Sequence, residues 1–445
     1  MMRESRLNVY KGAQRIGVLS LAEGEAFYGF SYDPAYVSDP RAIPLSASLP
    51  LASERYSGAR SLPFFEGLLP EGDARAVVAR QFHVSPHNPA QLIRVLGRDC
   101  AGDVMVIGED DPVQPPARDR YVALPGGLEA IARDPLREVA ELRAAHRLSL
   151  AGAQEKIALY HDDRASLQQG WFVPVDGSPS SHIVKPQVGE RFPHLALNEF
   201  LCMSAASRVG VEAAEVSVLF PASPLLIVRR YDRAMRADRT AAGLRLLDRV
   251  HQEDACQALG LDSSAKYEGE RTSYLSQVAS LVMAYAGRPA DDLRALHRLV
   301  LFNYVVGNCD AHLKNYSLIW ESSDAVRLAP AYDLVSTAVY DGRFGARLSR
   351  SMGVRMGGHL NIDKVDADDV AVAARTLRQS PKAARAERER LCDGLEDALL
   401  RAADDAAELG FGDDALQLAD RILFGAKIRM KALVDSAASA SGRSG

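Results

Sequence analysis

Hydrophobic and polar residues alternate along residues 6–35, where glycine-containing turns interrupt LNVYKGAQRIGVLSL and EAFYGFSYD. Successive side chains of a β-strand point to opposite faces, so this alternation predicts short antiparallel strands. Residues 88–107, NPAQLIRVLGRDCAGDVMVI, then predict a helix, a glycine-containing loop and a further strand. We therefore expect the first part of the chain to be rich in β-structure.

Composition along the chain indicates where its parts meet. Residues 108–127, GEDDPVQPPARDRYVALPGG, are rich in proline and charge, which indicates a boundary near residue 120. Helical spacing dominates from about residue 245 onward, and the low-complexity end SAASASGRSG predicts a disordered tail. The expected division is a subdomain at 1–120, a core at 121–245, a mainly helical domain at 246–435 and a tail at 436–445.

Charge and cysteine usage narrow the class of protein. The 445 residues include 53 basic and 58 acidic residues, a net charge of −5, so direct and dominant binding to nucleic acid is not expected. Five widely spaced cysteines without a C-x-x-C motif favour reduced thiols and argue against a disulfide framework or a zinc site. Without an apolar signal-peptide region or a stretch of roughly 20 apolar residues, we expect a soluble, cytoplasmic protein that does not contact membranes.

One stretch carries far more polarity than its neighbours. In NYVVGNCDAHLKNYSLIW, residues 303–320, five polar or charged residues fall within eight positions: Asn308, Asp310, His312, Lys314 and Asn315. The preceding DDLRALHRLVLFNYVVGN has the spacing of a buried helix that stops at Gly307. YSLIW and VRLAP predict a hairpin, and Asp333 follows it directly.

This order of residues has a known chemical use in phosphoryl transfer. In protein kinases a base Asp precedes a metal-binding Asn by five positions, and a second metal-binding Asp follows a short hairpin. Asp310 would accept the proton of the substrate hydroxyl, and Asn315 and Asp333 would hold Mg²⁺. An isolated D-x-x-x-x-N pattern more often caps a turn, but the hairpin and Asp333 favour the kinase interpretation.

A kinase also requires a lysine that contacts the phosphates and a glutamate that holds the lysine. SHIVKP predicts a strand that ends in Lys185, and Glu199 follows fourteen positions later in a helical segment. Small residues at 151–153, within AGAQEK, would let backbone N–H groups approach phosphates. Each feature has a plain alternative, since Lys185 and Glu199 could face solvent and residues 151–156 could form a simple hairpin.

Taken together, the motifs resemble one family, the HipA family of bacterial toxin kinases. The resemblance is carried by SLAGAQEKIAL, HIVKP, NEFLCM, RRYDR, HQEDACQALG, GNCDAHLKN and APAYDLVST, and by PLSASLPL, PFFEGLLPEG and GRDCAGDVMV near the amino terminus. It extends over nearly the whole chain, to about residue 360. It implies an α+β, two-lobed protein-kinase-like fold, related to phosphatidylinositol-kinase-like folds, with an extra N-terminal β-rich subdomain and a mainly helical C-lobe.

The resemblance also implies residue roles. Asp310 is the implied catalytic base, Asn315 and Asp333 the Mg²⁺ ligands, and Ser149 a site of autophosphorylation that would weaken ATP binding. Residues 229–231 would form the adenine hinge, and Glu199 would support Lys185. The residues implied to bind ATP are Ala151, Gly152, Ala153, Gln154, Glu155, Lys156, Lys185, Arg229, Arg230, Tyr231, His312, Asn315, Tyr332 and Asp333.

The implied function is that of an ATP- and Mg²⁺-dependent serine/threonine protein kinase, the toxin of a type II toxin–antitoxin pair. Its expected substrate is a translation-related protein such as an aminoacyl-tRNA synthetase, whose phosphorylation would cause growth arrest or persistence. The expected partner is a dimeric helix-turn-helix antitoxin, HipB-like. Operator DNA would be contacted mainly through that partner, because this chain shows no helix-turn-helix pattern of its own.

Other functions fit parts of the same pattern. The chain could be a nucleotide-binding scaffold that acts with an antitoxin as a transcriptional co-repressor. D-x-H-x-x-N also occurs in phosphatidylinositol kinases, but no basic or amphipathic membrane-facing surface is evident. A hydrolase could use Asp310, His312 and Asp333 around a transition metal, although no second histidine stands at ligand spacing.

Overall fold

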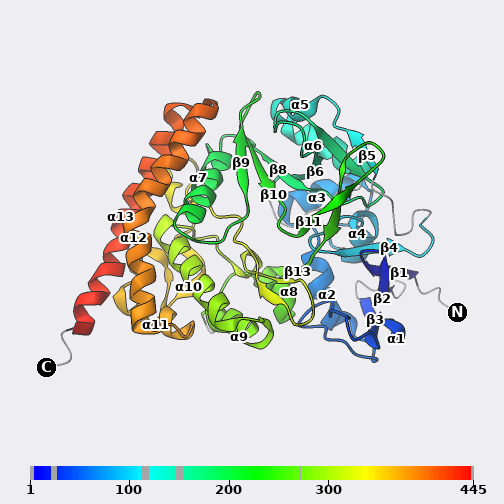
Figure 1. The fold of residues 1–445 in the computed structure, drawn as a ribbon, viewed down its shortest axis with the longest axis horizontal. Helices are drawn as coiled ribbons and strands as arrows, with labels where there is room; N and C mark the ends of the chain where they lie inside the picture. The colour runs from blue at the N-terminus through cyan, green and yellow to red at the C-terminus, as the bar shows by residue number, and fades with distance from the viewer. Residues whose placement is uncertain (1–4, 22–27, 112–119, 147–153, 271, 442–445) are drawn as a thin grey trace. The chain divides into compact units, whose positions relative to one another are not determined.

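The computed structural model describes residues 5–21, 28–111, 120–146, 154–270 and 272–441, and it divides the chain into two compact units (Figure 1). The first unit comprises Met1–Val188, Pro221–Ser263 and Ile319–Val326. The second comprises Gly189–Phe220, Ser264–Leu318 and Arg327–Gly445. The chain thus enters each unit more than once.

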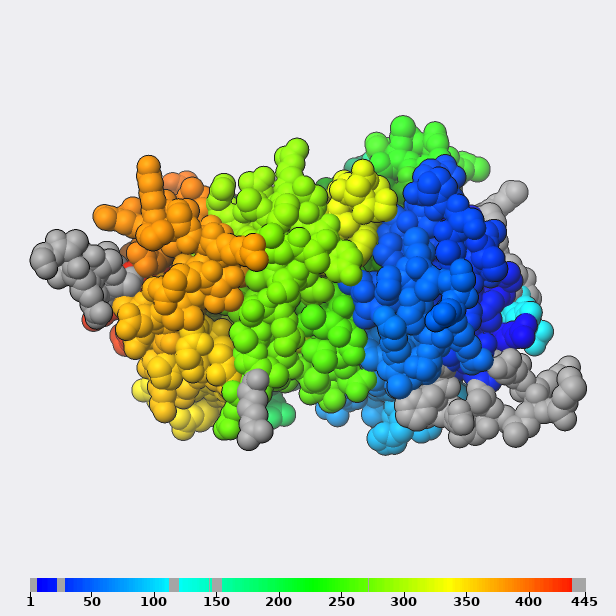
Figure 2. Space-filling view, turned by 90° about the horizontal axis from the view of Figure 1, so that it is seen from below, coloured from blue at the N-terminus to red at the C-terminus, as the bar shows by residue number. Residues whose placement is uncertain are grey.

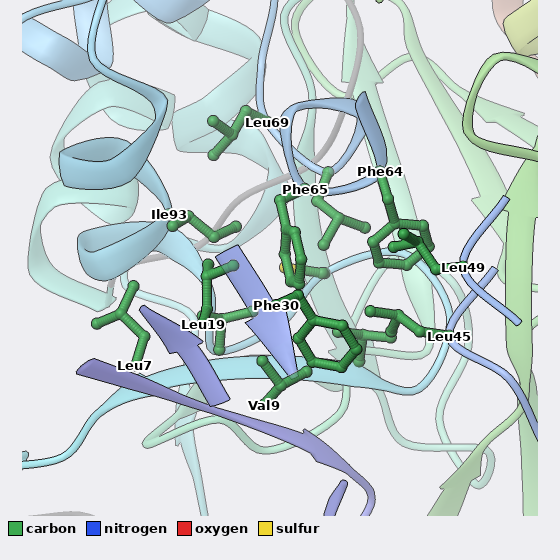
Figure 3. Close-up of a cluster of buried hydrophobic side chains, with 14 of the residues drawn as sticks. Leu7, Val9, Leu19, Phe30, Leu45, Leu49, Phe64, Phe65, Leu69 and Ile93 are labelled. Atoms are coloured by element: carbon green, nitrogen blue, oxygen red, sulfur yellow. The ribbon is translucent and has the colours of Figure 1, made fainter. Parts of the chain in front are cut away.

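The first unit begins with an antiparallel sheet whose strand order is β3-β2-β1-β4. Its strands are β1 (Ser5–Lys11), β2 (Gln14–Leu21), β3 (Tyr28–Tyr32) and β4 (Val104–Gly108), and its helices are α1 (Pro34–Val37), α2 (Gly58–Gly67), α3 (Gly72–Gln81) and α4 (Pro89–Leu96). Alternation places Leu7 and Val9 on one face of β1, where they pack with Phe30, Phe65 and Ile93 (Figure 3). The predicted strands and the predicted helix–loop–strand of residues 88–107 are confirmed.

The strands that this unit contributes to a second sheet run in the order β5-β7-β6-β8-β10. The strands are β5 (Arg120–Ala123), β6 (Ile157–His161), β7 (Trp171–Val175), β8 (His182–Pro186) and β10 (Leu225–Arg229). The unit also contains the helices α5 (Gly127–Arg133), α6 (Pro135–His146) and α8 (Ala255–Leu259), the paired strands β11 (Arg233–Arg239) and β12 (Arg245–Arg249), and β13 (His251–Asp254). Lys185 lies in β8 opposite Leu226 of β10, so the predicted strand SHIVKP is confirmed.

The second unit is built mainly from helices. They are α7 (Leu195–Arg208), α9 (Tyr274–Tyr285), α10 (Pro289–Val306), α11 (Ala367–Thr376), α12 (Pro381–Ala406) and α13 (Asp413–Ser441). The long helices α12 and α13 lie side by side in Figure 1, where α7 contacts α12 and α10 contacts α13. Figure 2 shows the yellow-green surface of α9 beside the orange surface of α11, and these two helices are in contact.

Short strands interrupt this helical region. β9 (Val216–Leu219) follows α7 in the chain, the hairpin of β14 (Ser317–Trp320) and β15 (Val326–Leu328) follows α10, and β16 (Ser351–Met356) pairs with β17 (His359–Asn361). The hairpin confirms the strands predicted from YSLIW and VRLAP. The mixture of sheets and long helices confirms the α+β class. No helix within the described ranges has the length and apolarity needed to cross a bilayer.

The predicted division of the chain into four parts stays a prediction. Contacts join residues 1–188 to 221–263, across the predicted borders at 120 and 245, because strands remote in sequence pair within one sheet. The helix α13 extends to Ser441, and the predicted disorder of residues 436–445 stays a prediction. Alanine has the highest helix propensity of all residues, which favours continuation of the helix through the Ala/Ser-rich segment.

Candidate active site

The polar stretch 308–315 follows directly from the end of α10. Pro289 occupies the first turn of this helix, and Gly307 ends it in the left-handed conformation, with φ +82°. A Cβ atom at position 307 would lie 2.6 Å from the Cβ atom of Ala338, so only glycine fits both the backbone and the packing. The predicted helix and its stop at Gly307 are confirmed.

Buried amides fix the first residues of this loop. Asn308 donates from its backbone N–H to the Asn303 carbonyl (2.8 Å) and from its side chain to Asn303 Oδ1 (2.9 Å). Its own Oδ1 accepts from the N–H of Asp310 (3.1 Å), and the N–H of Cys309 donates to Oγ1 of Thr337 (2.8 Å). Because these groups are buried, each hydrogen bond restrains the loop strongly.

Asp310 is the exposed residue that this framework presents. Its Oδ1 atom accepts a hydrogen bond of 2.5 Å from the hydroxyl of Tyr267, a residue that is 48% exposed. The ring of Tyr267 also lies edge-on to the ring of His312, with centroids 5.0 Å apart. Tyr267 was not predicted, and no local pattern could have identified it, since it precedes Asp310 by 43 positions.

Asn315 and Asp333 belong to segments that one tyrosine connects. Asn315 ends a short 3₁₀ turn, and its side chain donates to the Asp310 carbonyl (3.4 Å). Tyr332, the neighbour of Asp333, donates from its hydroxyl to the carbonyl of Lys314 (2.7 Å), the neighbour of Asn315. Asp333 itself has φ +54°, a left-handed conformation that Asp tolerates better than most residues.

A second buried amide joins α7 to the segment after Asp333. Asn198 donates to the Ser336 carbonyl (3.0 Å) and accepts from the Ser336 N–H (2.9 Å), in a two-bond clamp that is fully buried. Glu199, the next residue of α7, is 1% exposed, so the solvent-facing alternative for Glu199 is wrong. The second unit therefore holds Asp310, Asn315 and Asp333 on one hydrogen-bonded framework.

The remaining described candidates lie in the first unit. Lys185 is 3% exposed within β8, so the solvent-facing alternative is wrong for this residue too. Arg143 of α6 donates to Glu155 Oε2 (2.8 Å) and to the Lys156 carbonyl (2.5 Å), which anchors the residues just before β6. Lys185 and Glu199 belong to different units, and their pairing stays a prediction.

One residue of the predicted hinge, Arg230, forms hydrogen bonds to buried groups of the first unit. The guanidinium of Arg230 is buried and donates to both carboxylate oxygens of Asp232 (2.9 and 2.7 Å) and to Ser180 Oγ (2.8 Å). Its N–H donates to the Ser181 carbonyl (3.0 Å), so neither this N–H nor the side chain is available for adenine. The role of residues 229–231 as an adenine hinge, mainly through backbone groups, stays a prediction, and Arg229 is exposed at the end of β10.

Arg230 belongs to a buried ion cluster that the sequence analysis did not foresee. Asp99 and Asp232 are surrounded by Arg230, Arg233 and Arg249. Burial by itself would raise the pKa of Asp232, but the adjacent guanidinium groups hold it far below its usual value. The cluster joins the loop after α4 to the residues that follow β10.

Four predicted residues, Ser149, Ala151, Gly152 and Ala153, lie outside the described residues. For the metal, Asn315 and Asp333 offer amide and carboxylate oxygens, the hard ligands that Mg²⁺ prefers, and nucleotide phosphates would supply the others. Over the described ranges, no group of three or more His, Cys, Asp or Glu side chains is arranged to hold a metal ion by itself. The donor set therefore fits Mg²⁺ bound together with phosphate.

Comparison with known proteins places the chain in a family. Residues 148–399 match the HipA-like C-terminal domain and residues 7–107 the HipA N-terminal domain. The chain is 34% identical over 412 residues to "Putative kinase Y4mE" of Sinorhizobium fredii, covering 91% of this chain and 93% of that protein. It is 30% identical over 348 residues to "Serine/threonine-protein kinase toxin HipA" of Shewanella oneidensis, covering 75% and 76%.

A solved structure shares the fold. The HipA chain from the complex of HipA, HipB and operator DNA of Shewanella oneidensis MR-1 superposes with a TM-score of 0.75 at 23% identity, covering 97% of this chain and 99% of that chain. The kinase-like α+β fold expected from the sequence is thereby confirmed. With both family domains matched in order along its length, this chain belongs to the HipA family, whose curated relatives are named as kinases.

Proposed function

We propose that the protein is an ATP- and Mg²⁺-dependent serine/threonine protein kinase that acts in the cytoplasm as the toxin of a type II toxin–antitoxin pair. The observation that carries the proposal is the framework of the second unit, in which buried amides present an exposed Asp310 beside Asn315. An exposed, oriented carboxylate is suited to accept the proton of an incoming hydroxyl. The kinase names of the relatives support the same activity.

Within this proposal each predicted residue has one task. Asp310 orients and deprotonates the serine or threonine hydroxyl of the protein substrate, while Asn315 and Asp333 hold Mg²⁺, which would neutralise charge on the phosphates. Lys185 contacts the phosphates with support from Glu199, and Gln154, Glu155 and Lys156 end the loop that cradles them. Arg229, Tyr231, His312 and Tyr332 would complete the nucleotide site.

The labelling of protein by γ-labelled ATP with Mg²⁺ tests the activity. Phosphatase-treated wild type, Asp310→Asn and the matched control Asp397→Asn are compared alone and with cell extract. Asp397 is an exposed aspartate of α12 that pairs with its helix neighbour Arg401. We expect labelling by wild type and control, and a loss of about 100-fold or more in Asp310→Asn. Equal labelling by Asp310→Asn would overturn the assignment of the base.

The partner proposed for this chain is a dimeric, HipB-like helix-turn-helix antitoxin. The structural neighbour was solved with HipB and operator DNA, and the net charge of −5 fits a chain that contacts DNA mainly through its partner. A gel-shift assay with operator DNA should give a complex only when the antitoxin is present. Strong binding by this chain alone would contradict that arrangement.

The finer proposals concern the target and self-regulation. The target is a translation-related protein, with an aminoacyl-tRNA synthetase as first candidate, whose phosphorylation would cause growth arrest or persistence. Phosphate on Ser149 would add nearly two negative charges beside the phosphate loop and weaken ATP binding. Mass spectrometry of labelled extract identifies the target, and ATP affinity of Ser149→Asp tests the self-inactivation, which an unchanged affinity would exclude.

The competing function is a nucleotide-binding co-repressor scaffold, which the intact Asp310, Asn315 and Asp333 do not favour. The scaffold predicts ATP binding without labelling of any protein by the wild type.

A further inference from the structure

A pocket of about 690 Å³ opens in the second unit, and nothing in the proposed kinase function uses it. Its walls come from the end of α10, the 3₁₀ turns Thr337–Val339 and Ile362–Lys364, the segment 341–350 and one face of α13. Of these, α10 and α13 are labelled in Figure 1. This volume lies within the range of small-molecule sites. Five arginines line it: Arg343, Arg347, Arg350, Arg421 and Arg429.

Arg429 is an unusual member of this set because it is only 7% exposed. Its Nε atom donates to the carbonyl of Val305 (2.9 Å), which lies in the last turn of α10, where carbonyls have no partner within the helix. No carboxylate lies within ion-pairing distance of its guanidinium in the described part of the chain. Burial, with a contribution from the nearby Arg350, lowers its pKa to about 10, although the more distant carboxylate of Asp363 opposes the shift. A buried guanidinium that lacks a carboxylate within ion-pairing distance is costly and attracts an anion.

The other arginines differ in how far they are neutralised. Arg350 pairs with Asp363 (2.8 Å) and Arg343 pairs with Asp341 (2.7 Å). Arg421 stacks on the ring of Phe344, 4.6 Å from its centroid. The three aspartates of the lining, the third being Asp420, leave the five arginines with a formal excess of two positive charges.

The rim of the pocket is apolar. Phe424 is 74% exposed, the highest value among large hydrophobic side chains of the described residues, and Ile428 is 55% exposed. Both line the pocket, and together with Arg421 and Arg429 they recur at the spacing of one helical face of α13. Exposed apolar side chains beside unneutralised arginines are characteristic of binding sites.

We propose that this pocket binds a phosphate monoester carried on an apolar or aromatic body. The phosphate would sit against the guanidinium of Arg429, and the body would cover Phe424 and Ile428. A phosphate monoester carries close to two negative charges at neutral pH, which matches the excess of two in the lining, and guanidinium forks bind phosphate oxygens in pairs. The proposal does not depend on the kinase activity, since binding is measured without turnover.

Calorimetric titration of the full chain with phenyl phosphate, inorganic phosphate and benzoate tests the proposal. We expect phenyl phosphate to bind more tightly than either probe, because only phenyl phosphate offers both the dianion and the ring. Phe424→Ser should weaken the binding of phenyl phosphate but leave the binding of inorganic phosphate unchanged. Equal or tighter binding of benzoate would overturn the preference for phosphate, and no binding of phenyl phosphate would overturn the site.

Variants separate this pocket from the nucleotide site. Arg429→Met should weaken the binding of phenyl phosphate about tenfold or more, because a charge-assisted hydrogen bond to the phosphate would be lost. Since Arg429 also supports α10, the double variant Arg347→Gln/Arg421→Gln, at two exposed positions, provides a second test with the same expected direction. Arg401→Gln on α12 is the matched control and should bind normally. Weakening by Lys185→Met with normal binding by both pocket variants would place the ligand elsewhere and overturn the proposal.

Discussion

Replacement of Glu253 by glutamine should change how the stability of the first unit depends on pH. Glu253 lies in β13 and is 1% exposed. Its Oε2 atom accepts from Ser46 Oγ (2.5 Å) and its Oε1 atom from the N–H of Ala47 (3.0 Å). Burial raises the pKa of the carboxyl from 4.5 to about 7, although these two hydrogen bonds oppose the rise.

The size and sign of the effect follow from this pKa. Between about pH 4.5 and pH 7 the folded protein holds a proton on Glu253 that the unfolded chain has released. The free energy of unfolding therefore falls as pH rises through this window, and the loss is complete above about pH 7. The difference between the two pKa values corresponds to about 3 kcal/mol. Glu253→Gln removes the proton exchange, so the variant should gain about 3 kcal/mol relative to wild type between pH 4.5 and 7.5.

Denaturant unfolding followed by tryptophan fluorescence measures this difference. Both tryptophans, Trp171 and Trp320, lie in the first unit, so the signal follows the unit that contains Glu253. Lys11 and His251 also titrate nearby, since burial lowers the pKa of Lys11 to about 8 and lowers that of His251. The carboxylate of Glu253 raises the pKa of Lys11, so the comparison ends at pH 7.5, below the pKa of Lys11 in the wild type.

The matched control is Glu396→Gln, at an exposed position of α12 that pairs with Lys427. It should shift the free energy of unfolding by well under about 1 kcal/mol at every pH. A constant difference between Glu253→Gln and wild type from pH 4.5 to 7.5 would refute the argument, because a buried carboxyl with a raised pKa cannot give that result.

Three further substitutions test other parts of the structure. Tyr267→Phe should lower the KM for the protein substrate about threefold to tenfold and leave the KM for ATP unchanged, because the variant lacks the hydroxyl that donates a hydrogen bond to Asp310. A raised KM for the protein substrate in steady-state assays would contradict this. Asp99→Asn should lower the free energy of unfolding by about 3–5 kcal/mol, measured with denaturant, since the buried arginines would lose one of their carboxylate partners. A decrease below about 1 kcal/mol would contradict a stabilising role of the cluster. Gly307→Ala should lower the free energy of unfolding by about 1–3 kcal/mol, because alanine is strained at this positive φ and its Cβ would clash with Ala338. An unchanged melting temperature would exclude that strain.

Local features were predictable because they depend on neighbours in the sequence. Alternation along residues 6–35 and 3.6-residue spacing before Gly307 each reflect which face of an element is buried, and the observed strands and α10 follow them. The spacing from Asp310 to Asn315 indicated the candidate loop because this spacing, too, is a relation between near neighbours in the sequence.

Features made by remote segments could not be predicted in this way. Tyr267 meets Asp310, Asn198 clamps Ser336 and Glu253 reaches Ser46 across 43, 138 and 207 positions. No periodicity records such pairs, because they depend on which buried surfaces the chain brings together.

The sequence by itself thus determined the elements, the family and the residues available for chemistry. Only the tertiary structure decided which polar groups are buried with a partner, that Arg230 belongs to an ion cluster and that Arg429 lines a pocket with no carboxylate of the described residues in ion-pairing distance. The physical reason is that burial and electrostatic pairing are properties of the packed molecule, and the free energy of a charged group depends on its surroundings in space.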